Sequence, residues 1–430
     1  MVLIAHLADI HLGKKQYHLG FRENDIYELF NDAIDIILRE HVKTVVISGD
    51  LFDEPRPKNK ALKIAIDGFK KLEDRGIKII LVPGDHERLR TRDMLSLLIF
   101  ESVLDNVVVL GAPKDKERVD TEYIDKEYGI AFYALPFFGN KQRARKVMLY
   151  FLSKAEAFFN KNNSLKKVLV AHYGVEEILP IDAVLSISDI PSVDYAAFGH
   201  VHKRVITYIP RGGVLGYPGS IDIIDRREIS DWIEFGKGFY IVDLSMSPDK
   251  SMVHKIDLNV RPQYIIETDQ ENVVKELDKL AGTLTSNTKK PIIVNLVLHI
   301  KKGSIHNLKR LYQLYQDTMY LRIHPVFVEE EKNIDYSSLE VFNEKEILGR
   351  YMGASEEVAD LLYDLVERLA GKDTTITAEE IMEIMRSIYE KWPKARNITK
   401  ITFYEDKGSR EVVDKRKKSD SRGILKFIGG

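Results

Sequence analysis

The chain contains no cysteine among its 430 residues. This absence excludes disulfides, thiolate metal sites, iron–sulfur clusters and cysteine nucleophiles, so a bound metal must take its ligands from His, Asp, Glu or Asn. The sequence also contains no apolar run of the length that spans a membrane, and it begins without the basic start and long apolar stretch of a signal peptide. We therefore expect a cytoplasmic protein that does not interact with membranes.

The sequence also lacks a strong overall charge, since its formal net charge is −2. A protein of this charge does not bind nucleic acid through an overall positive charge. Any electrostatic contact with nucleic acid must come from a local excess of basic residues. The segment Asp406–Lys426 is rich in Lys and Arg, with Lys415–Lys418 at its centre. Such a segment is either a solvated, mobile tail or a contact for phosphates whose affinity depends strongly on salt.

The length and the 44% hydrophobic content predict a soluble globular protein with two or three domains. In residues 1–245, short apolar runs alternate with helical periodicity over Glu23–Glu40 and Lys60–Asp74. Continuously apolar runs are typical of strands in sheets that are covered on both faces. We therefore predict an α/β domain of stacked sheets with outer helices. The predicted strands are Val2–Ala8, Thr44–Ser48, Ile77–Val82, Asn106–Leu110, Gly129–Leu135, Val168–Ala171 and Tyr195–Phe198.

Two further regions follow a cluster of Ser, Pro and Asp at Ser245–Lys250. Residues 246–330 are predicted to form a smaller α/β unit, and residues 331–345 are predicted to form a solvated linker. The smaller unit is predicted to contain a strand near Tyr264–Glu267, a helix over Glu271–Leu280, a strand over Ile292–Ile300, and then another helix and a strand toward Val328.

Residues 346–393 are predicted to form a pair of helices, followed by a basic tail over residues 394–430. Glu356–Ala370 carries one apolar stripe, and Thr377 with Glu380 forms a capping-box pattern before a second helix that Pro393 ends. Two helices alone do not make a full core, so the pair docks either on its own chain or in the groove of a partner. We favour a partner, because helix-in-groove recognition uses this spacing of apolar residues.

Residues that bind metals follow five of the predicted strands. The carboxyl ends of strands in α/β sheets lie at one edge, where ligands bind, so these five strand ends are expected to converge on one cleft. Asp-x-His and His-x-His place two side chains on the same side of an extended segment. The five groups are Asp9-Ile10-His11, Gly49-Asp50, Gly84-Asp85-His86-Glu87, Ala171-His172 and Gly199-His200-Val201-His202.

Mixed imidazole and carboxylate groups of this kind suit a two-metal phosphoesterase. Hydrolysis of a phosphodiester needs a strong nucleophile at neutral pH and neutralisation of charge, and two ions about 3.5–4 Å apart supply both. His and carboxylate ligands match Mn, Fe or Zn. A single Asp-x-His is weak evidence, because an isolated histidine such as His6 is more often a core residue. Five such groups in this order favour a metallophosphoesterase site over a set of histidines that only support the fold.

The ordered pattern is similar to the calcineurin-like metallophosphoesterase superfamily. The residues that flank these five groups, together with Tyr217-Pro218-Gly219-Ser220 and Val260-Arg261-Pro262, resemble the sequences of the archaeal DNA double-strand-break repair nucleases. These nucleases are the meiotic recombination eleven homologues related to bacterial SbcD. The later regions match that family's order of nuclease, capping (DNA-recognition) and ATPase-binding regions. The resemblance therefore implies a metallophosphoesterase sandwich, a small α/β capping domain and a C-terminal helical pair.

The resemblance also implies a set of site residues. The first metal would take Asp9, His11, Asp50 and His202, and the second would take Asp50, Asp85, His172 and His200, with Asp50 bridging. His86 would lie beside the scissile phosphate and stabilise the transition state or protonate the leaving oxygen. The expected substrate contacts are His18, Asp53, Lys203 and Ser220; for His18 an ordinary surface position is the alternative.

The family's activity and partners are implied in the same way. Its members cut DNA, including ends and hairpins, as manganese-preferring 3′→5′ exonucleases and single-strand endonucleases. They form homodimers and bind an SMC-like coiled-coil ABC ATPase, which places the protein on the chromosome. The sequence contains no Gly-x-x-x-x-Gly-Lys-Ser/Thr loop, so ATP would be handled by another subunit.

This sequence departs from the family's pattern at two positions. Asp85 stands where Asn is common, and its extra charge is expected to tighten metal binding and reduce Lewis acidity. Asp53 stands where His is common, and an ionised carboxylate there would repel phosphate and weaken exonuclease action. Two alternatives therefore stay open, namely another phosphodiesterase of the superfamily and a DNA-end-binding scaffold with weak or vestigial nuclease activity.

The segment Met94–Leu104 is apolar almost all round. A helix that packs on one face of its own domain needs only one apolar side. We therefore predict that this segment contributes to the homodimer interface, with burial in the monomer core as the alternative.

Overall fold

The computed structural model describes residues 2–88, 94–114, 119–138, 141–181, 183–283, 290–301, 308–328, 355–370 and 378–392. The chain divides into two compact units, one within residues 1–330 and the other within residues 331–430. The predicted linker and the basic tail lie outside the described residues.

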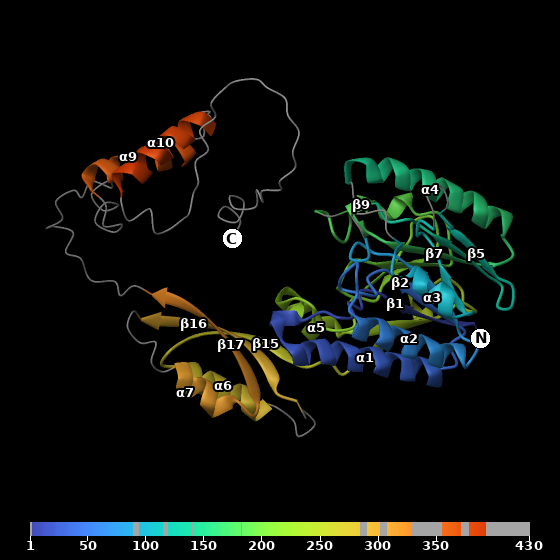
Figure 1. Ribbon diagram of the computed structural model, residues 1–430. Coiled ribbons are helices and arrows are strands. Elements are labelled where there is room, and N and C mark those ends of the chain that lie inside the picture. Colours follow the sequence, from blue (N-terminus) through green and yellow to red (C-terminus); the bar gives the residue numbers. More distant parts are fainter. Residues whose placement is uncertain are drawn as a thin grey trace. The chain divides into compact units, whose positions relative to one another are not determined.

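Two six-stranded sheets form the body of the first unit (Figure 1). The first has the order β14-β13-β1-β2-β3-β4, and the second has the order β11-β12-β10-β7-β6-β5. The first sheet consists of β1 (Leu3–Leu7), β2 (Thr44–Ser48), β3 (Lys78–Val82), β4 (Val107–Val109), β13 (Gly238–Asp243) and β14 (Val253–Asp257). The second consists of β5 (Glu122–Asp125), β6 (Ile130–Ala134), β7 (Lys166–His172), β10 (Tyr195–Gly199), β11 (Val205–Tyr208) and β12 (Val214–Tyr217).

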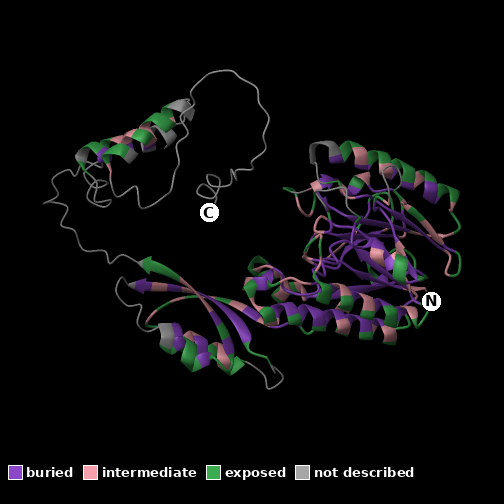
Figure 2. Cartoon of the chain, in the orientation of Figure 1, coloured by how far each residue is buried: buried purple, intermediate pink, exposed green. Residues whose placement is uncertain are grey.

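Helices cover the outer face of each sheet, as Figures 1 and 2 show. Helices α1 (Gly20–Arg39), α2 (Asn59–Glu73) and α3 (Leu98–Val103) pack on the first sheet, and α4 (Lys141–Lys161) packs on the second. A third apolar cluster, with Ile4, Val46, Phe132 and Val170, fills the space between the sheets. Both faces of the central strands are therefore buried, which is why those strands are continuously apolar. This arrangement confirms the predicted α/β sandwich.

The remaining elements of this body are short. They are the two-stranded pair β8 (Gly174–Val175) and β9 (Ala183–Leu185), helix α5 (Ile229–Phe235), and 3-10 turns over Gln16–His18, Ile187–Asp189, Arg226–Glu228 and Lys250–Met252.

The register of the parallel strands brings five strand ends to one edge. Strand β1 runs parallel to β2, and β2 to β3, with Ser48 opposite Val82. In the other sheet β7 runs parallel to β10, with His172 opposite Gly199. The loops after these strands therefore start at the same level in both sheets, where they can supply ligands to one cleft.

The structure bears on two of the sequence-based expectations. Strand β14 follows the segment Ser245–Lys250, yet it pairs with β13, so the first sheet continues past the predicted boundary at residue 245. In Met94–Leu104, the side chains of Leu95, Leu97, Leu98 and Phe100 are buried in the core of the first sheet, which is the alternative that the sequence left open. Met94 and Val103 of the same segment are exposed, so its contribution to a homodimer interface stays a prediction.

A smaller α/β layer completes the first unit, and we call it the capping domain. Its parallel sheet has the order β15-β16-β17, and α6 and α7 pack on it around a core that includes Leu277, Leu296 and Leu311. The elements are β15 (Gln263–Asp269), α6 (Val273–Thr283), β16 (Ile292–Lys301), α7 (Leu308–Tyr315) and β17 (Met319–Val328). This agrees with the order of strands and helices predicted for this region.

A buried charge network joins α1 to the start of the capping domain. Arg261 donates to both Asp25 oxygens, at 2.6 and 2.9 Å, and Arg22 donates to Asp25 at 2.6 Å. Gln263 at the start of β15 donates to Gln16 at 2.8 Å. Burial alone would raise the pKa of Asp25, but the hydrogen bond from Arg261 and the charge of Arg22 lower it below the ordinary value of 3.8.

The second unit contains α9 (Glu356–Ala370) and α10 (Ala378–Lys391). Val358, Leu365 and Ile388 are buried between them. Both helices occur where the sequence predicts them, whereas Thr377 of the predicted capping box lies outside the described residues. Among the helices described here, none combines the length and the apolar character needed to cross a membrane.

Replacement of Asp25 tests the charge network. We predict that Asp25→Asn lowers the free energy of unfolding by about 3 kcal/mol at neutral pH, because it leaves the buried Arg261 without its carboxylate and Arg22 with Asp222 alone. The lowered pKa means that Asp25 stabilises the fold above pH 3.8 and loses this effect as the pH falls through the folded-state pKa. Urea unfolding at pH 7 and in acid measures both effects. A difference that stays constant down to the lowest pH would contradict this assignment.

Candidate metal centre

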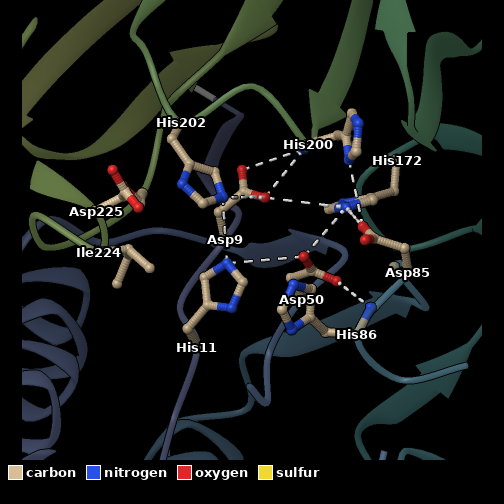
Figure 3. A network of polar contacts seen from close by, with 12 residues as sticks. Asp9, His11, Asp50, Asp85, His86, His172, His200, His202, Ile224 and Asp225 are labelled. Carbon is tan, nitrogen blue, oxygen red and sulfur yellow. Dashed lines mark hydrogen bonds and ion pairs between the residues drawn. The ribbon is translucent and has the colours of Figure 1, made fainter. Parts of the chain in front are cut away.

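All seven predicted metal ligands come together at the strand ends (Figure 3). Six of them form two groups of three, and the seventh is an aspartate that lies between the groups. Within each group the ligand atoms lie within 4.8 Å of one another. The first cluster is Asp9, His11 and His202, from the loops after β1 and β10. The second cluster is Asp85, His172 and His200, from the loop after β3, the end of β7 and the loop after β10.

The shared aspartate is Asp50, in the loop after β2. Its Oδ2 atom lies 3.7 Å from His11 Nε2 and 3.4 Å from His172 Nε2, so one oxygen faces a histidine of each cluster. Its Oδ1 atom accepts a hydrogen bond from the backbone N of His86 at 3.0 Å. Asp50 is thus placed to bridge two ions.

The ligand loops turn sharply because several ligands adopt a left-handed backbone. The φ angle is 50° at Asp9, 52° at His11, 53° at Asp50 and 83° at His200. Such conformations cost non-glycine residues on the order of 1 kcal/mol or more each and persist where the surrounding structure fixes them. The turns direct these side chains into the cleft.

Three glycines let the loops approach the ligands closely. A Cβ atom on Gly84 would lie 2.1 Å from Asp50 Oδ1, and one on Gly49 would lie 2.1 Å from His172 Nδ1. A Cβ on Gly199 would lie 2.1 Å from the Ser48 carbonyl oxygen. Any larger residue at these positions must displace a ligand or the strand that carries it.

The distances between the donors fit divalent ions. His11 Nε2 and His202 Nε2 lie 3.2 Å apart, and Asp85 Oδ1 lies 3.0 Å from His172 Nε2 and 3.3 Å from His200 Nδ1. Ligand atoms that are each about 2.1 Å from one ion are separated by roughly 3 to 3.5 Å. Each cluster offers two imidazole nitrogens and a carboxylate, and Asp50 adds a further oxygen to both. The residues therefore fit two divalent metal ions.

The charges of the centre favour ligation. Burial alone would lower the pKa of His172, but the charge of Asp50 and hydrogen bonds to Asp50 and Asp85 raise it well above 6.5. Burial opposes ionisation of Asp50, but the charge of His172 holds its pKa at about 2, and hydrogen bonds to His172 and His200 lower that of Asp85 in the same way. Asp50 and Asp85 are thus ionised, and an ion that binds here takes the place of a proton on His172.

Two buried glutamates support the ligands. Glu87 accepts hydrogen bonds from the backbone N of Asp50, Phe52 and Gly84 at 2.8–3.0 Å, which fixes two ligand loops to each other. Burial and the charge of Asp50 raise the pKa of Glu87 to about 7. Glu228 accepts from His202 Nδ1 at 2.7 Å and from the buried amine of Lys237 at 2.6 Å.

Sequence reasoning missed the roles of both glutamates. Glu87 belongs to a quoted motif but was assigned no role, since its contacts are to the backbone of another loop. Glu228 lies in no motif, and only the fold brings it to His202. A buried acidic residue at such a distance in sequence gives no local signal.

His86 lies at the mouth of the centre. Its Nδ1 lies 2.7 Å from the backbone O of Asp53, so Nδ1 donates and Nε2 is the nitrogen left for other partners. Burial opposes the charged form, but the charge of Asp50 and the hydrogen bond to Asp53 raise the pKa of His86 above 6.5. His86 is therefore a candidate proton donor in the cleft.

The four expected substrate contacts lie in different surroundings. Ser220 has no exposed surface, and its hydroxyl donates to Glu228, so it has no access to a substrate. The Asp53 carboxylate lies 3.4 Å from His11 Nδ1 and 3.2 Å from Lys14 Nζ. Lys203 pairs with Asp231 at 3.4 Å, and His18 lines a cavity with basic residues near the metal centre.

The fold and the site define this protein as a calcineurin-like phosphoesterase. Residues 2–204 match the family model of that description. The fit of two divalent ions makes it a metal-dependent phosphodiester hydrolase.

Known relatives narrow the family further. The chain is 31% identical over 385 residues to the DNA double-strand break repair protein Mre11 of Saccharolobus solfataricus, covering 86% of this chain and 95% of that protein. It is 32% identical over 376 residues to the protein of the same name from Methanocaldococcus jannaschii, covering 86% and 96% of the two chains. The chain belongs to the Mre11 family of DNA double-strand break repair proteins.

Replacement of Gly84 tests the assembly of the centre. We predict that Gly84→Ala weakens Mn²⁺ binding by about 10- to 100-fold, because the new methyl group displaces the Asp50 carboxylate. Calorimetric titration of the metal-free protein measures the affinity. Gly282→Ala is the matched control, since a Cβ there meets no atom within 4 Å. Equal affinities of the two variants would contradict the placement of Asp50.

Proposed function

We propose that this protein is a DNA nuclease that uses two manganese ions to process double-strand breaks, as a 3′→5′ exonuclease and single-strand endonuclease. Asp9, His11 and His202 hold one ion, Asp85, His172 and His200 hold the other, and Asp50 is shared. The names of the relatives support DNA repair, and the similarity extends over nearly their whole length.

The observation that carries the proposal is a basic cavity beside the metal centre. A cavity of about 460 Å³ is lined by His11, His86 and His202 of the centre. A second cavity of about 550 Å³ is lined by five basic residues, namely Lys14, Lys15, Arg226, Arg227 and Arg322, the last of which belongs to the capping domain. The two cavities share Lys14, Ile224, Asp225 and Arg227, and Figure 3 shows Ile224 and Asp225 beside the ligands.

A row of cations that leads into a metal site suits a polyanion better than a small phosphate ester. Lys and Arg bind the phosphates of a nucleic acid backbone and fix its position, without reading its sequence. A strand held by Arg226 and Arg322 would bring the next phosphates past Lys14 toward the metal ligands. A phosphatase needs neither the capping domain nor this cavity.

The chemistry follows from the placement of the residues. When bound, the two ions polarise the phosphate and supply a nucleophile at neutral pH. The Asp53 carbonyl holds the His86 ring by Nδ1, which leaves Nε2 to donate to a phosphate oxygen or to the leaving oxygen. Arg226 and Arg322, which line the neighbouring cavity, would neutralise the adjacent phosphates.

Replacement of His86 tests the nuclease. We predict that His86→Ala lowers the rate of DNA cleavage by about 100-fold or more, because a positioned proton donor is lost, and leaves Mn²⁺ binding unchanged. Degradation of labelled duplex and hairpin DNA under manganese measures the rate, and calorimetry measures metal binding. A wild type that binds DNA and manganese but never cuts would instead support the DNA-end-binding scaffold. Cleavage of small esters without length-dependent DNA degradation would support another phosphodiesterase.

Replacement of Arg226 tests the basic cavity. We predict that Arg226→Ala weakens binding to DNA of any sequence and reduces the slope of log affinity against log salt by about one. Arg39→Ala is the control, since Arg39 is an exposed arginine at the end of α1, outside the residues that line either cavity. Fluorescence anisotropy at several salt concentrations measures both variants, and equal slopes would remove this cavity from the DNA path.

We further propose that the helical pair α9–α10 binds an SMC-like coiled-coil ABC ATPase and that the protein acts as a homodimer on the chromosome. The pair has a small core of its own, and Met382 of α10 is exposed, as expected of a surface that a partner covers.

A further inference from the structure

Both histidines of the first cluster have a carboxylate behind the metal-binding edge. His202 directs Nε2 toward His11, and its Nδ1 lies 2.7 Å from Glu228 Oε1. His11 directs Nε2 toward His202, and its Nδ1 lies 3.4 Å from Asp53 Oδ1. In metal sites, an acceptor on the far nitrogen fixes the tautomer and the orientation of the ring and makes the ligand more basic.

The Glu228 carboxylate cannot turn away from His202. Its other oxygen accepts from Lys237 Nζ at 2.6 Å and from Ser220 Oγ at 3.0 Å, and both of these residues are buried. The backbone N of Asp225 also donates to Glu228, at 3.1 Å. Four fixed donors therefore hold this side chain behind the ligand, which is more than the stability of a surface turn requires.

The Asp53 carboxylate occupies the corresponding position at His11. Among the residues that the structure describes, the buried His11 Nδ1 has no hydrogen-bond partner, and Asp53 Oδ1 has none apart from its ion pair with Lys14. The two atoms face each other at 3.4 Å, so a small shift of the ring makes the bond. Lys14 Nζ lies 3.2 Å from the same oxygen and holds the carboxylate in place. Asp53 therefore faces a metal ligand and a lysine.

The second cluster has a different support. His172 Nδ1 donates to the Ser48 carbonyl oxygen at 2.8 Å, which is a neutral acceptor. In the second cluster the side chains of Asp85 and His200 are 38% and 20% exposed and only that of His172 is fully buried, whereas in the first cluster those of Asp9 and His11 are 0% and 1% exposed. His202, at 28%, is the member of the first cluster that reaches solvent. Water therefore competes more strongly for the second ion.

We propose that the site of Asp9, His11 and His202 binds its divalent ion more tightly than the site of Asp85, His172 and His200, and that Glu228 and Asp53 are positioning residues that cause the difference. The two ions are then loaded in a fixed order, the first site before the second. This proposal rests on the two-metal site of the proposed function, but it does not depend on DNA as the substrate.

Calorimetric titration of the metal-free, full-length protein with Mn²⁺ tests the proposal. In a His200→Ala background, which removes a ligand from the second site alone, Asp53→Asn and Glu228→Gln are each expected to weaken Mn²⁺ binding by about 10-fold or more. In a His202→Ala background, which removes a ligand from the first site alone, Asp53→Asn is expected to change the affinity less than about twofold. The wild type is expected to show two binding steps, the tighter of which His202→Ala removes.

Asp231→Asn is the matched control, because Asp231 lines the same cleft and pairs with Lys203 rather than with a ligand. Thermal unfolding without metal checks each variant. Glu228→Gln leaves the buried Lys237 unpaired and lowers stability, whereas Asp53→Asn is isosteric at a partly exposed site and keeps the test valid.

Unchanged Mn²⁺ affinity of Asp53→Asn and Glu228→Gln in the His200→Ala background would overturn the proposal, as would equal affinities of the two wild-type sites. A protein that shows the expected titrations but does not cut DNA would count against the proposed function alone.

Discussion

The position of the Asp50 carboxylate decides whether two ions can share this cleft. One of its oxygens faces His11 and His172 at 3.7 and 3.4 Å, and the other is held by the backbone N of His86. Its own backbone N donates to Glu87, and the missing side chain of Gly84 leaves room for it. The contacts with His86, Glu87 and Gly84 join the loops after β2 and β3, so the parallel pairing of these strands fixes the position of Asp50.

The fold concentrates charge at this edge and compensates for it nearby. Carboxylates and imidazoles gather here, and in the absence of ions the proton on His172 balances the charge of Asp50. Lys14 and Lys237 balance the outer carboxylates Asp53 and Glu228. The network of Asp25 and Arg261 fixes the start of the capping domain, whose Arg322 extends the row of cations beside the centre. The metal centre and the cavity proposed to bind DNA thus share Lys14 and the loop of Asp225 and Arg227.

Much of this could be predicted from the sequence, because central strands such as Thr44–Ser48 are continuously apolar and the ligands follow them directly. The edge strand β14 was missed, since His254, Lys255 and Asp257 are exposed and only two of its five residues are apolar. For the apolar segment around Leu98, the sequence left a dimer interface and the monomer core open, because burial on all sides and burial by a partner produce the same pattern. Glu228 was missed because its contact with His202 exists only in the folded chain. Asp53 was interpreted as a residue that repels the substrate phosphate, whereas in the structure its carboxylate faces His11.

The most direct test of the two-ion centre is anomalous diffraction from crystals soaked in manganese. The account predicts two anomalous peaks on either side of Asp50, one among Asp9, His11 and His202 and the other among Asp85, His172 and His200. A single peak that both clusters share, or peaks away from these residues, would contradict it.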